Sequence, residues 1–380
     1  MSVAVLHVCD KFGVRGSSIH GVSRLFSWWF PRYDRARFEV FLCGLKREEP
    51  ATRWLGEQGI PVHQLGRSRF DPRIAADLRA LARRLGARIL HVHGYAAADF
   101  GRIAARLAGC RLVLHEHFAD PRMPAYQGVA DRLLAPLTDA AIAVSRSTRE
   151  FLVARRHVPA GRVRLIWNGA PLDEFAPVAR ERALRVRREL GVADDARLVG
   201  TIGRLNTQKG HRYLLDAAAR VAGRLPDTRF LIAGDGDLLE DLRRQAEGLG
   251  LGARVVFAGH RTDVPDLLGA LDVFCLSSLY EGTPLALFEA MAAGKAIVST
   301  NVDGCREVLE DAASGVLVPA ADAAALAEAL ERVLSSDEER AALAARALEA
   351  SRRYDVRACV DQMQQLYDEL LSGGDRAGSR

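Results

Sequence analysis

Residues 272–300 read DVFCLSSLYEGTPLALFEAMAAGKAIVST. The stretch begins and ends with short, largely apolar runs, at 272–278 and at 295–300. Between them, a turn that contains Gly282 and Pro284 leads into a segment rich in alanine and leucine, which predicts a helix that begins near Leu285. A buried strand, a helix and a second buried strand in this order are typical of a βαβ unit with parallel strands.

The same alternation continues in both directions along the chain. Strands are expected at 3–8, 38–44, 61–65, 88–93, 111–117, 139–145 and 163–169, and again at 197–203, 229–236, 254–260, 272–278, 295–300 and 315–319. Each run is short, apolar and flanked by helical or turn signals, as in parallel strands that are buried on both faces. The sequence therefore predicts an α/β protein with two doubly wound, Rossmann-like sheets.

The length of 380 residues exceeds the size at which a single hydrophobic core stops growing, so two domains are expected. Two prolines, a glycine and several charges interrupt the pattern at 169–181. We therefore expect an N-terminal domain at 1–172 and a C-terminal domain at 173–355. The tail at 356–372 has apolar residues at helical spacing, and we expect it to pack back on the first domain. Two such domains that face each other would enclose a cleft at the carboxyl ends of their strands.

The composition is that of a globular protein, with 49% hydrophobic and 27% charged residues. No apolar run reaches the roughly 20 residues that a membrane-spanning helix needs. The start, MSVAVLHVCD, has no basic region and is interpreted as a first strand rather than a signal peptide, so a cytoplasmic location is expected. The six cysteines lie far apart without a CxxC pair, which indicates reduced thiols rather than a metal site.

The charge is distributed unevenly. Residues 1–176 contain 27 basic and 16 acidic residues, a net +11, whereas residues 177–380 contain 26 and 32, a net −6. A basic half suits nucleic acid, an anionic membrane or an acidic substrate. No helix-turn-helix, finger or RNP pattern is present, so no nucleic-acid partner is expected. Trp28, Trp29 and Phe30, with arginines behind them, either dock on anionic lipid or form a buried first helix, and the sequence leaves both open.

The chemistry is concentrated in EGTPLALFE, residues 281–289. The helix that begins near Leu285 leaves backbone N–H groups around Gly282 and Thr283 for phosphate or sugar oxygens. Glu281 and Glu289 flank this turn as acceptors for sugar or ribose hydroxyls. The alternative is a strand–turn–helix unit whose glutamates cap the helix or face solvent.

A second motif, VGTIGRLNTQKGHRYLLDAA at 199–218, places Arg204 directly after Gly203 at a strand end and Lys209 on the following loop. Two fixed cations at one point would stabilise the charge that develops on a departing diphosphate. The alternative is a pair of surface charges on an ordinary loop. In FLIAGDGDLLEDL, at 230–242, Leu239 occupies the third glycine position of a dinucleotide fingerprint, so an NAD site is not favoured. Gly234 is expected in a tight turn that lines the nucleotide site.

EGTPLALFE resembles the motif of two glutamates separated by seven residues in the retaining glycosyltransferases of family 4, which have the GT-B fold. The resemblance implies that Glu281 orients the donor sugar, with the turn at Gly282, Thr283, Pro284 and Leu285 beside it, and that Glu289 binds the ribose. It further implies that Arg204 and Lys209 bind the donor diphosphate and that His260 and Arg261 lie near the base.

In the first half, the resemblance covers a glycine-rich loop and a histidine at a strand end. The loop ends in His20-Gly21 where the family has two glycines, and Gly21 would approach the donor phosphates. The strand RLVLHEH ends in two histidines, of which His117 matches the histidine near the donor sugar, with His115 as the rival. A purely structural role for either ring is the alternative.

The resemblance extends over residues 1 to about 372 and implies a retaining transfer of a hexose-type sugar from a UDP- or GDP-linked donor. The acceptor would be a hydroxyl of a glycan or of a lipid-linked acceptor, in polysaccharide or glycoconjugate synthesis. No cofactor and no metal are expected, because no carboxylate pair is placed for a divalent ion and Arg204 with Lys209 can supply the charge. A nucleotide-sugar epimerase, or a non-catalytic sugar-nucleotide binding protein of the same fold, are the alternatives.

Overall fold

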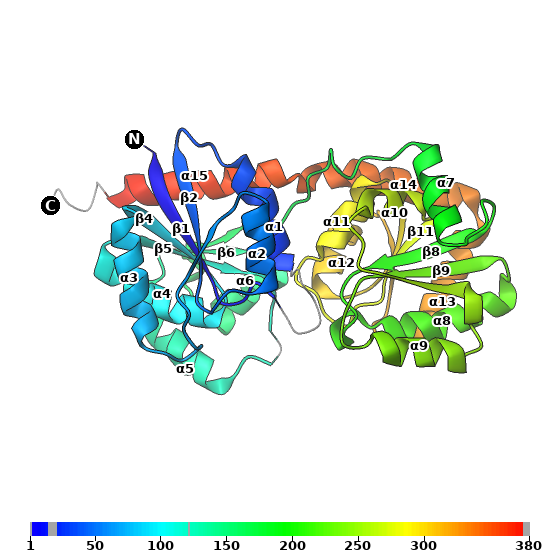
Figure 1. Ribbon diagram of the computed structural model, residues 1–380, viewed down its shortest axis with the longest axis horizontal. Helices are drawn as coiled ribbons and strands as arrows, with labels where there is room; N and C mark the ends of the chain where they lie inside the picture. The colour runs from blue at the N-terminus through cyan, green and yellow to red at the C-terminus, as the bar shows by residue number, and fades with distance from the viewer. Residues whose placement is uncertain (1, 14–20, 121, 375–380) are drawn as a thin grey trace. The chain divides into compact units, whose positions relative to one another are not determined.

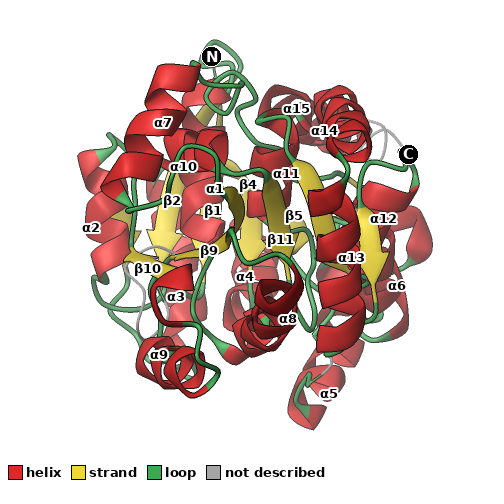
Figure 2. Cartoon of the chain, turned by 90° about the vertical axis from the view of Figure 1, so that its right-hand side faces the viewer, coloured by secondary structure: helices red, strands yellow, loops and turns green. Residues whose placement is uncertain are grey.

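The computed structural model describes residues 2–13, 21–120 and 122–374. The described strands form two sheets, one of seven strands in the order β3-β2-β1-β4-β5-β6-β7 and one of six in the order β10-β9-β8-β11-β12-β13. Neighbouring strands are parallel in both sheets, and helices flank the strands on both sides (Figure 1, Figure 2). The predicted class, α/β with two doubly wound sheets, is confirmed.

The seven-stranded sheet contains β1 (Val3–Cys9), β2 (Phe38–Gly44), β3 (Val62–Gln64), β4 (Ala87–His93), β5 (Arg111–Glu116), β6 (Ala140–Ala143) and β7 (Val163–Leu165). Its helices are α1 (Gly21–Trp29), α2 (Pro50–Glu57), α3 (Arg73–Arg84), α4 (Tyr95–Ala108), α5 (Ala125–Leu134), α6 (Arg146–Ala154) and α15 (Val356–Gly374). Short 3-10 turns, Phe30–Arg32, Ala135–Leu137 and Ala160–Arg162, complete it.

The six-stranded sheet contains β8 (Arg197–Ile202), β9 (Thr228–Ala233), β10 (Val255–Gly259), β11 (Val273–Leu276), β12 (Ala296–Thr300) and β13 (Val316–Val318). Its helices are α7 (Arg180–Glu189), α8 (His211–Arg224), α9 (Leu239–Gly248), α10 (Val264–Ala270), α11 (Leu285–Ala292), α12 (Asp303–Glu310), α13 (Ala323–Ser335) and α14 (Asp337–Ser351). The 3-10 turns are Thr207–Lys209, Gly252–Arg254 and Arg352–Tyr354. Every strand predicted from the sequence is present, with ends that differ by a few residues.

The chain divides into two compact units. The first unit contains the chain up to Asn168 and the segment from Val356 onward, and the second contains Gly169–Asp355. The boundary between the two units follows Asn168. The sequence pattern predicted it a few residues later, after residue 172. The tail forms the single helix α15, whose buried residues Val360, Met363 and Tyr367 belong to the first unit.

Alternation along the strands decides how each sheet is covered. In the first unit, helices α3 and α4 cover the face of the sheet toward which Leu6, Leu90 and Leu112 point. These side chains share a core with Ile74 and Leu78 of α3. In the second unit, Val199 and Phe230 share a core with residues of α8, α9 and α13, while α7, α10 and α11 lie on the opposite face (Figure 1). Each unit therefore has a core of its own.

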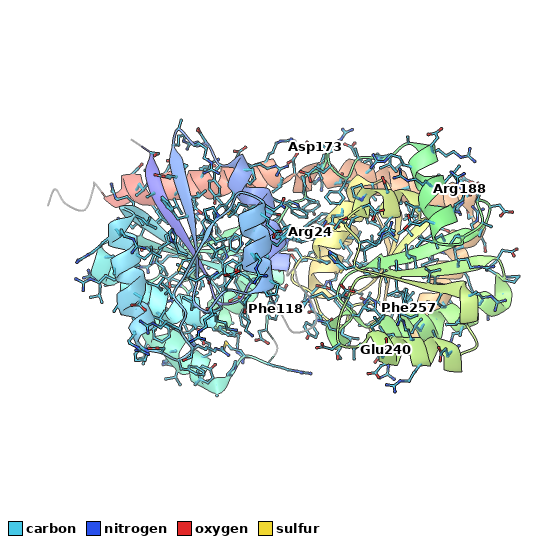
Figure 3. All side chains as sticks on the ribbon, viewed as in Figure 1. Arg24, Phe118, Asp173, Arg188, Glu240 and Phe257 are labelled. Atoms are coloured by element: carbon cyan, nitrogen blue, oxygen red, sulfur yellow. The ribbon has the colours of Figure 1, made fainter. Side chains whose placement is uncertain are left out.

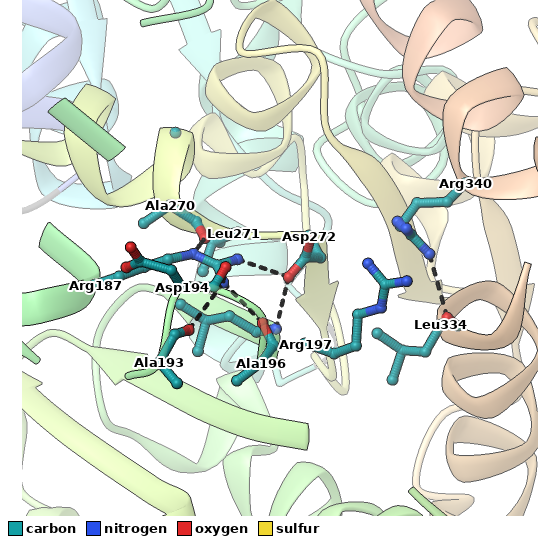
Figure 4. A network of polar contacts seen from close by, with 12 residues as sticks. Arg187, Ala193, Asp194, Ala196, Arg197, Ala270, Leu271, Asp272, Leu334 and Arg340 are labelled. Carbon is teal, nitrogen blue, oxygen red and sulfur yellow. Dashed lines mark hydrogen bonds and ion pairs between the residues drawn. The ribbon is translucent and has the colours of Figure 1, made fainter. Parts of the chain in front are cut away.

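One buried arginine ties helix α7 to the starts of two strands (Figure 4). Arg187 donates to the carbonyl oxygen of Ala270 at 2.9 Å and pairs with Asp272 at 2.7 Å. The same carboxylate accepts the backbone N–H of Leu198 at 2.8 Å. The next residue, Arg188, is exposed (Figure 3), so only one of the two arginines has this role. The contacts fix the beginnings of β8 and β11, and hence the direction of their carboxyl ends.

The aromatic run of the first helix is part of the core. Trp28, Trp29 and Phe30 are 6%, 0% and 3% exposed. The interpretation as a buried helix is correct, and these three side chains do not form a membrane-docking surface. Among the described residues, no helix combines the length and the apolar character that crossing a membrane requires.

Candidate functional site

Backbone hydrogen bonds join three loops at the carboxyl ends of β8, β9 and β10. Gly203 donates to Ala233 at 2.9 Å, and Gly234 donates to Gly259 at 2.7 Å. Gly234 has a φ of 138°, and a Cβ at this position would overlap the carbonyl oxygen of Gly203. A glycine is therefore required where the two loops touch. The tight turn expected at Gly234 is present, and it supports the backbone from which Arg204 projects.

Glu281 and Lys209 form an ion pair at the carboxyl ends of β11 and β8. The Lys209 Nζ lies 2.6 Å from Glu281 Oε1, and the two side chains are 15% and 6% exposed. Ser278 donates to the same carboxylate oxygen at 2.7 Å, and Gln208 donates to Oε2 at 3.4 Å. A largely buried carboxylate with this many donors is held in one orientation.

Arg204 lies beside this pair but has a different environment. Among the described residues, its guanidinium makes no hydrogen bond and no ion pair. Burial lowers the pKa of Arg204, and the negative charge of Glu281 acts in the opposite direction. A partly buried guanidinium without a contacting acceptor is unfavourable by itself, so the position suits an anionic ligand.

The turn after β11 presents the beginning of α11. Gly282, Thr283 and Pro284 are buried, whereas Leu285 and Ala286 are partly exposed. The N-cap residue of α11 is Pro284, whose side chain makes no capping hydrogen bond. Uncapped N–H groups at a helix N-terminus attract anionic oxygens. Helix α11 is therefore the second feature of this edge of the sheet that favours an anion.

Glu289 lies one turn further along α11 and is 1% exposed. The structure thus places the second glutamate of the motif inside the unit, while Glu281 is held by Lys209 at the strand end. As the sequence predicted, Glu281 precedes the turn and Glu289 lies inside the helix, and the two carboxylates have different environments.

His260 and Arg261 follow β10 directly. His260 is exposed. Arg261 donates from Nη2 to Asp263 Oδ2 at 2.7 Å and pairs with Glu189 on α7. Arg261 therefore already has two carboxylate partners, and His260 is the more accessible of the two residues.

In the first unit, His117 follows the last residue of β5 and is partly buried, whereas His115 is 1% exposed. Gly21 is the first residue of α1, with nothing within 4 Å of the position where a Cβ would stand. The remainder of the glycine-rich loop, residues 14–20, lies outside the described residues.

Comparisons with known proteins identify the family. The model of the glycosyl transferases group 1 matches residues 184–350, and that of glycosyltransferase family 4 matches residues 21–174. A phosphatidyl-myo-inositol mannosyltransferase of Mycobacterium tuberculosis is 30% identical over 336 residues, which are 84% of each chain. The chain belongs to the group 1 glycosyltransferases of family 4.

Further relatives of this glycosyltransferase agree. The UDP-Gal:alpha-D-GlcNAc-diphosphoundecaprenol alpha-1,3-galactosyltransferase of Escherichia coli is 32% identical over 255 residues, which cover 64% of this chain and 66% of the relative. The crystal structure of Alr3699/HepE from Anabaena in complex with UDP matches with a TM-score of 0.83 at 24% identity, over 97% of this chain and 100% of that one. The fold is therefore GT-B, as the resemblance implied.

Sequence reasoning missed three residues that hold the glutamate turn of this glycosyltransferase. Ser278 and Gln208 bind the Glu281 carboxylate. Gly304, in the first turn of α12, approaches the turn so closely that a Cβ would overlap the carbonyl oxygen of Gly282. Ser278 lies in the stretch 272–300 and Gln208 lies next to Lys209, so the sequence already placed both residues beside the predicted site. Nothing in the sequence connects Gly304 with Gly282.

Sequence reasoning also missed a cluster in the first unit, which we call the histidine face and which consists of His7, His91, His93, His115 and His117. Alternation puts these rings on the side of β1, β4 and β5 that faces away from α3 and α4. Trp29 stacks on His115 with ring centroids 5.3 Å apart. The signal in the sequence was the repeated spacing of two in HVH and HEH.

The histidine face contains the donor atoms that a metal site would need. In two groups, one of His7, His91 and His93 and one of His93, His115 and His117, the nearest ring nitrogens lie within 4.8 Å of one another. However, His115 and His117 are stacked with ring planes 13° apart, and His91 and His93 with planes 22° apart. Lone pairs lie in the ring plane, so stacked rings do not direct them at one ion. The donor set is present, but the orientation of the rings does not fit a metal ion.

Proposed function

We propose that the protein transfers a hexose-type sugar, with retention, from a UDP- or GDP-linked donor to a hydroxyl of a glycan or of a lipid-linked acceptor. The observation that carries the proposal is Arg204, a partly buried guanidinium without a contacting acceptor among the described residues, beside the Lys209–Glu281 pair. The N-terminus of α11, where the N-cap residue Pro284 offers no capping side chain, adds a second attraction for phosphate.

The ion pair suggests how donor binding proceeds. When a diphosphate approaches Arg204, the ammonium of Lys209 exchanges the carboxylate of Glu281, now 2.6 Å away, for a phosphate oxygen. Glu281 then accepts from a sugar hydroxyl while Ser278 and Gln208 keep it in place. One charge pair thus separates into two contacts with the same ligand, which ties sugar and diphosphate recognition together.

In the transfer, the bond from the anomeric carbon to the departing phosphate oxygen breaks, and a bond to the acceptor oxygen forms on the same face of the sugar. The acceptor hydroxyl gives its proton to the departing phosphate oxygen. Arg204 and Lys209 stabilise the negative charge that grows on the diphosphate, more in the transition state than in the ground state. No side chain has to act as a strong base.

The names of related proteins support the substrate classes. Solved structures of Alr3699/HepE are complexes with UDP and with UDP-glucose. The Escherichia coli relative is named for UDP-Gal and a diphosphoundecaprenol acceptor, and the mycobacterial one for phosphatidyl-myo-inositol. The ligands of Alr3699/HepE support a nucleotide-diphosphate donor, and the names of the two bacterial relatives support a lipid-linked acceptor.

The decisive experiment measures release of UDP and GDP over a panel of nucleotide sugars, with and without acceptor, for Arg204→Ala and Lys209→Met. Loss of one preorganised donor to a developing charge lowers kcat by about 10²–10³-fold, so losses of this size are expected for both variants. Arg212→Ala, which removes an exposed arginine of the adjacent helix α8, should leave the rate unchanged. Unchanged turnover in the Arg204 and Lys209 variants would refute the assignment.

Two other results would favour other functions. A new sugar nucleotide formed from donor alone would identify an epimerase, and tight donor binding without turnover would identify a binding protein.

The proposed reaction needs no divalent metal, because two cationic side chains already serve the diphosphate. Activity should therefore persist in EDTA at the rate seen without it. Complete loss in EDTA, with recovery on adding Mg²⁺, would contradict this part of the proposal.

A further inference from the structure

Helix α5 has polar side chains on its inner face and apolar side chains on its outer face. Gln127 and Asp131 are fully buried, whereas Tyr126, Val129 and Leu133 are 46%, 64% and 72% exposed. The spacing of three and four residues places the latter three on one face of the helix. A surface helix normally turns its apolar face toward the core and its polar face toward water. The packing of the first unit therefore does not account for the apolar face of α5.

Buried charges hold α5 in this orientation. The Asp131 carboxylate accepts from Arg102 of α4 at 2.6 Å and from Arg156, which follows α6, at 2.5 Å. Gln127 donates to Asp99 of α4 at 2.9 Å. A rotation that turned the apolar face inward would remove a carboxylate from two fully buried arginines, which is strongly unfavourable. The apolar face is thus fixed toward the outside of the first unit, and both views show α5 at the margin of that unit (Figure 1, Figure 2).

The loop before α3 extends the apolar face. The ring of Phe70 packs edge to face on that of Tyr126, with ring centroids 5.8 Å apart. We call Phe70, Tyr126, Val129 and Leu133 the α5 patch. Among the described residues, three of its members, Phe70, Val129 and Leu133, are the most exposed large hydrophobic side chains. Contiguous exposed apolar patches mark surfaces that bind proteins or membranes.

Three arginines border the α5 patch. The guanidinium of Arg69 lies 5.4 Å from the centroid of the Phe70 ring. Arg132 directly precedes Leu133 and is exposed, and Arg122 is exposed on the loop that leads to α5. Within the part of the chain that the structure describes, none of the three arginines makes an ion pair. Their charges are therefore available to an anionic partner.

The carboxylates close to these arginines are engaged with other groups. Asp71 pairs with Arg73, and Asp120 accepts from the Tyr95 hydroxyl at 3.0 Å. Asp131 lies inside the unit. The exposed charge at the border of the α5 patch is therefore cationic, in line with the net +11 of residues 1–176.

We propose that the α5 patch docks the first unit on an anionic lipid surface. Its apolar side chains enter the boundary between headgroups and acyl chains, and the bordering arginines contact the anionic headgroups. A second copy of this chain is a poorer occupant, because a two-fold contact through the same patch would bring the arginines of both copies together.

The α5 patch and the end of β5 belong to one stretch of chain. His117 and the exposed Phe118 follow β5, and a short loop leads from them to α5. Docking through α5 therefore brings the end of β5 close to the lipid surface. The consequence for the reaction rests on the proposed function, in which a lipid-linked acceptor is present at that surface.

Cosedimentation of the full-length protein with lipid vesicles tests the proposal without any turnover. Vesicles of equal parts phosphatidylcholine and phosphatidylglycerol should bind the protein, and vesicles of phosphatidylcholine alone should bind it much more weakly. Binding to the anionic vesicles should decrease in about 1 M NaCl, where the Debye length is about 3 Å. An absence of binding to the anionic vesicles in low salt would overturn the proposal.

Paired variants locate the contact on the protein. Leu133→Gln should weaken binding to the anionic vesicles at least about tenfold, because an apolar side chain no longer leaves water. Arg132→Gln should weaken it about fivefold. Leu249→Gln and Arg188→Gln, at exposed positions of the second unit, are the matched controls and should bind like the unmodified protein. Because all four side chains are exposed, the urea midpoint should stay the same in each variant. Equal vesicle binding by all four variants would overturn the assignment to the α5 patch.

Two further measurements separate the other outcomes. A dimer in sedimentation equilibrium without lipid, which Leu133→Gln dissociates, would identify a second copy as the occupant and overturn the proposal. Normal donor turnover without vesicle binding would overturn this inference alone. Vesicle binding without turnover would support this inference and contradict only the proposed function.

Discussion

At the scale of single residues, the Lys209–Glu281 pair shows why the residues of the motif in this glycosyltransferase cannot each be given a separate role in binding. The sequence indicates a carboxylate for the sugar and a cation for the diphosphate. The structure shows the two bound to each other, with Arg204 as the neighbouring cation that has no such contact among the described residues. In the proposed function the three side chains respond to a ligand together, because a phosphate that takes Lys209 also releases Glu281.

The buried histidines predict how the stability of the first unit depends on pH. Burial lowers the native pKa of His7 to about 3 and lowers the pKa values of His91, His93 and His115 well below the usual value, so these rings stay neutral in the folded state. In the unfolded chain they bind protons below about pH 6.5. Stability is therefore fully present above that pH and is lost as the pH falls, by up to about 1.4 kcal/mol per pH unit for each ring.

Three carboxyl groups of the first unit act in the opposite direction. Burial raises the pKa of Asp10 to about 6 and also raises the pKa values of Asp99 and Glu116, so the folded state binds these protons before the unfolded chain does. For Asp10, stability increases as the pH falls between about 6 and 4. Four rings outweigh three carboxyl groups, and the urea midpoint should decrease between pH 7 and 5.5. All four tryptophans, at 28, 29, 54 and 167, lie in the first unit, so fluorescence follows it. His260→Gln, at an exposed position, should leave the slope unchanged, and a midpoint that is constant over this range would contradict the prediction.

At the scale of elements, the strands could be predicted because strands that are buried on both faces leave continuous apolar runs. The motif residues could be predicted because they stand directly after such runs. The histidine face could not, because alternation tells which rings share a face but not which distant helix covers it. Tyr367, whose hydroxyl contacts the ring of His91, is 276 positions from it. Gly304 was missed for the same reason, since its partner is a carbonyl oxygen on another loop.

The contact between α12 and the glutamate turn predicts a large effect for Gly304→Ala. The added Cβ would overlap the carbonyl oxygen of Gly282, and backbone cannot move aside as a flexible side chain does. The turn must shift, and a displacement of about 1 Å at a positioning element can lower turnover about 10²-fold. Overpacking should also reduce stability by about 1–3 kcal/mol. Steady-state kinetics and urea unfolding measure the two effects.

The matched control is Gly223→Ala on helix α8, where the added Cβ would meet nothing within 4 Å. This variant should be as active as the unmodified protein and slightly more stable, because alanine favours helix. Equal activity of the Gly304 and Gly223 variants would mean that the turn adapts without loss.

At the scale of the whole molecule, the chain forms a first unit, then a second, and returns to complete the first with α15. The first unit therefore cannot finish its core until residues 356–374 have been made. Helix α15 contributes Val360, Met363 and Tyr367, all 0% exposed, to the face of the sheet that contains the histidines. The sequence predicted this return from the amphipathic tail, but not that the hydroxyl of Tyr367 would contact His91 and Tyr33 inside the first unit.

Because each unit has its own core, a defect in α15 should destabilise one unit and spare the other. Met363→Ala removes a fully buried side chain, and such truncations reduce stability by about 2–5 kcal/mol. The tryptophan transition in urea should therefore move to lower concentration, while hydrogen exchange at the β8 and β11 amides of the second unit should stay as slow as before. Gln362→Ala, at an exposed neighbouring position of the same helix, should change neither measurement. If exchange in β8 and β11 accelerates together with the tryptophan transition, the two units unfold as one cooperative body, and the return of α15 stabilises the entire chain rather than the first unit alone.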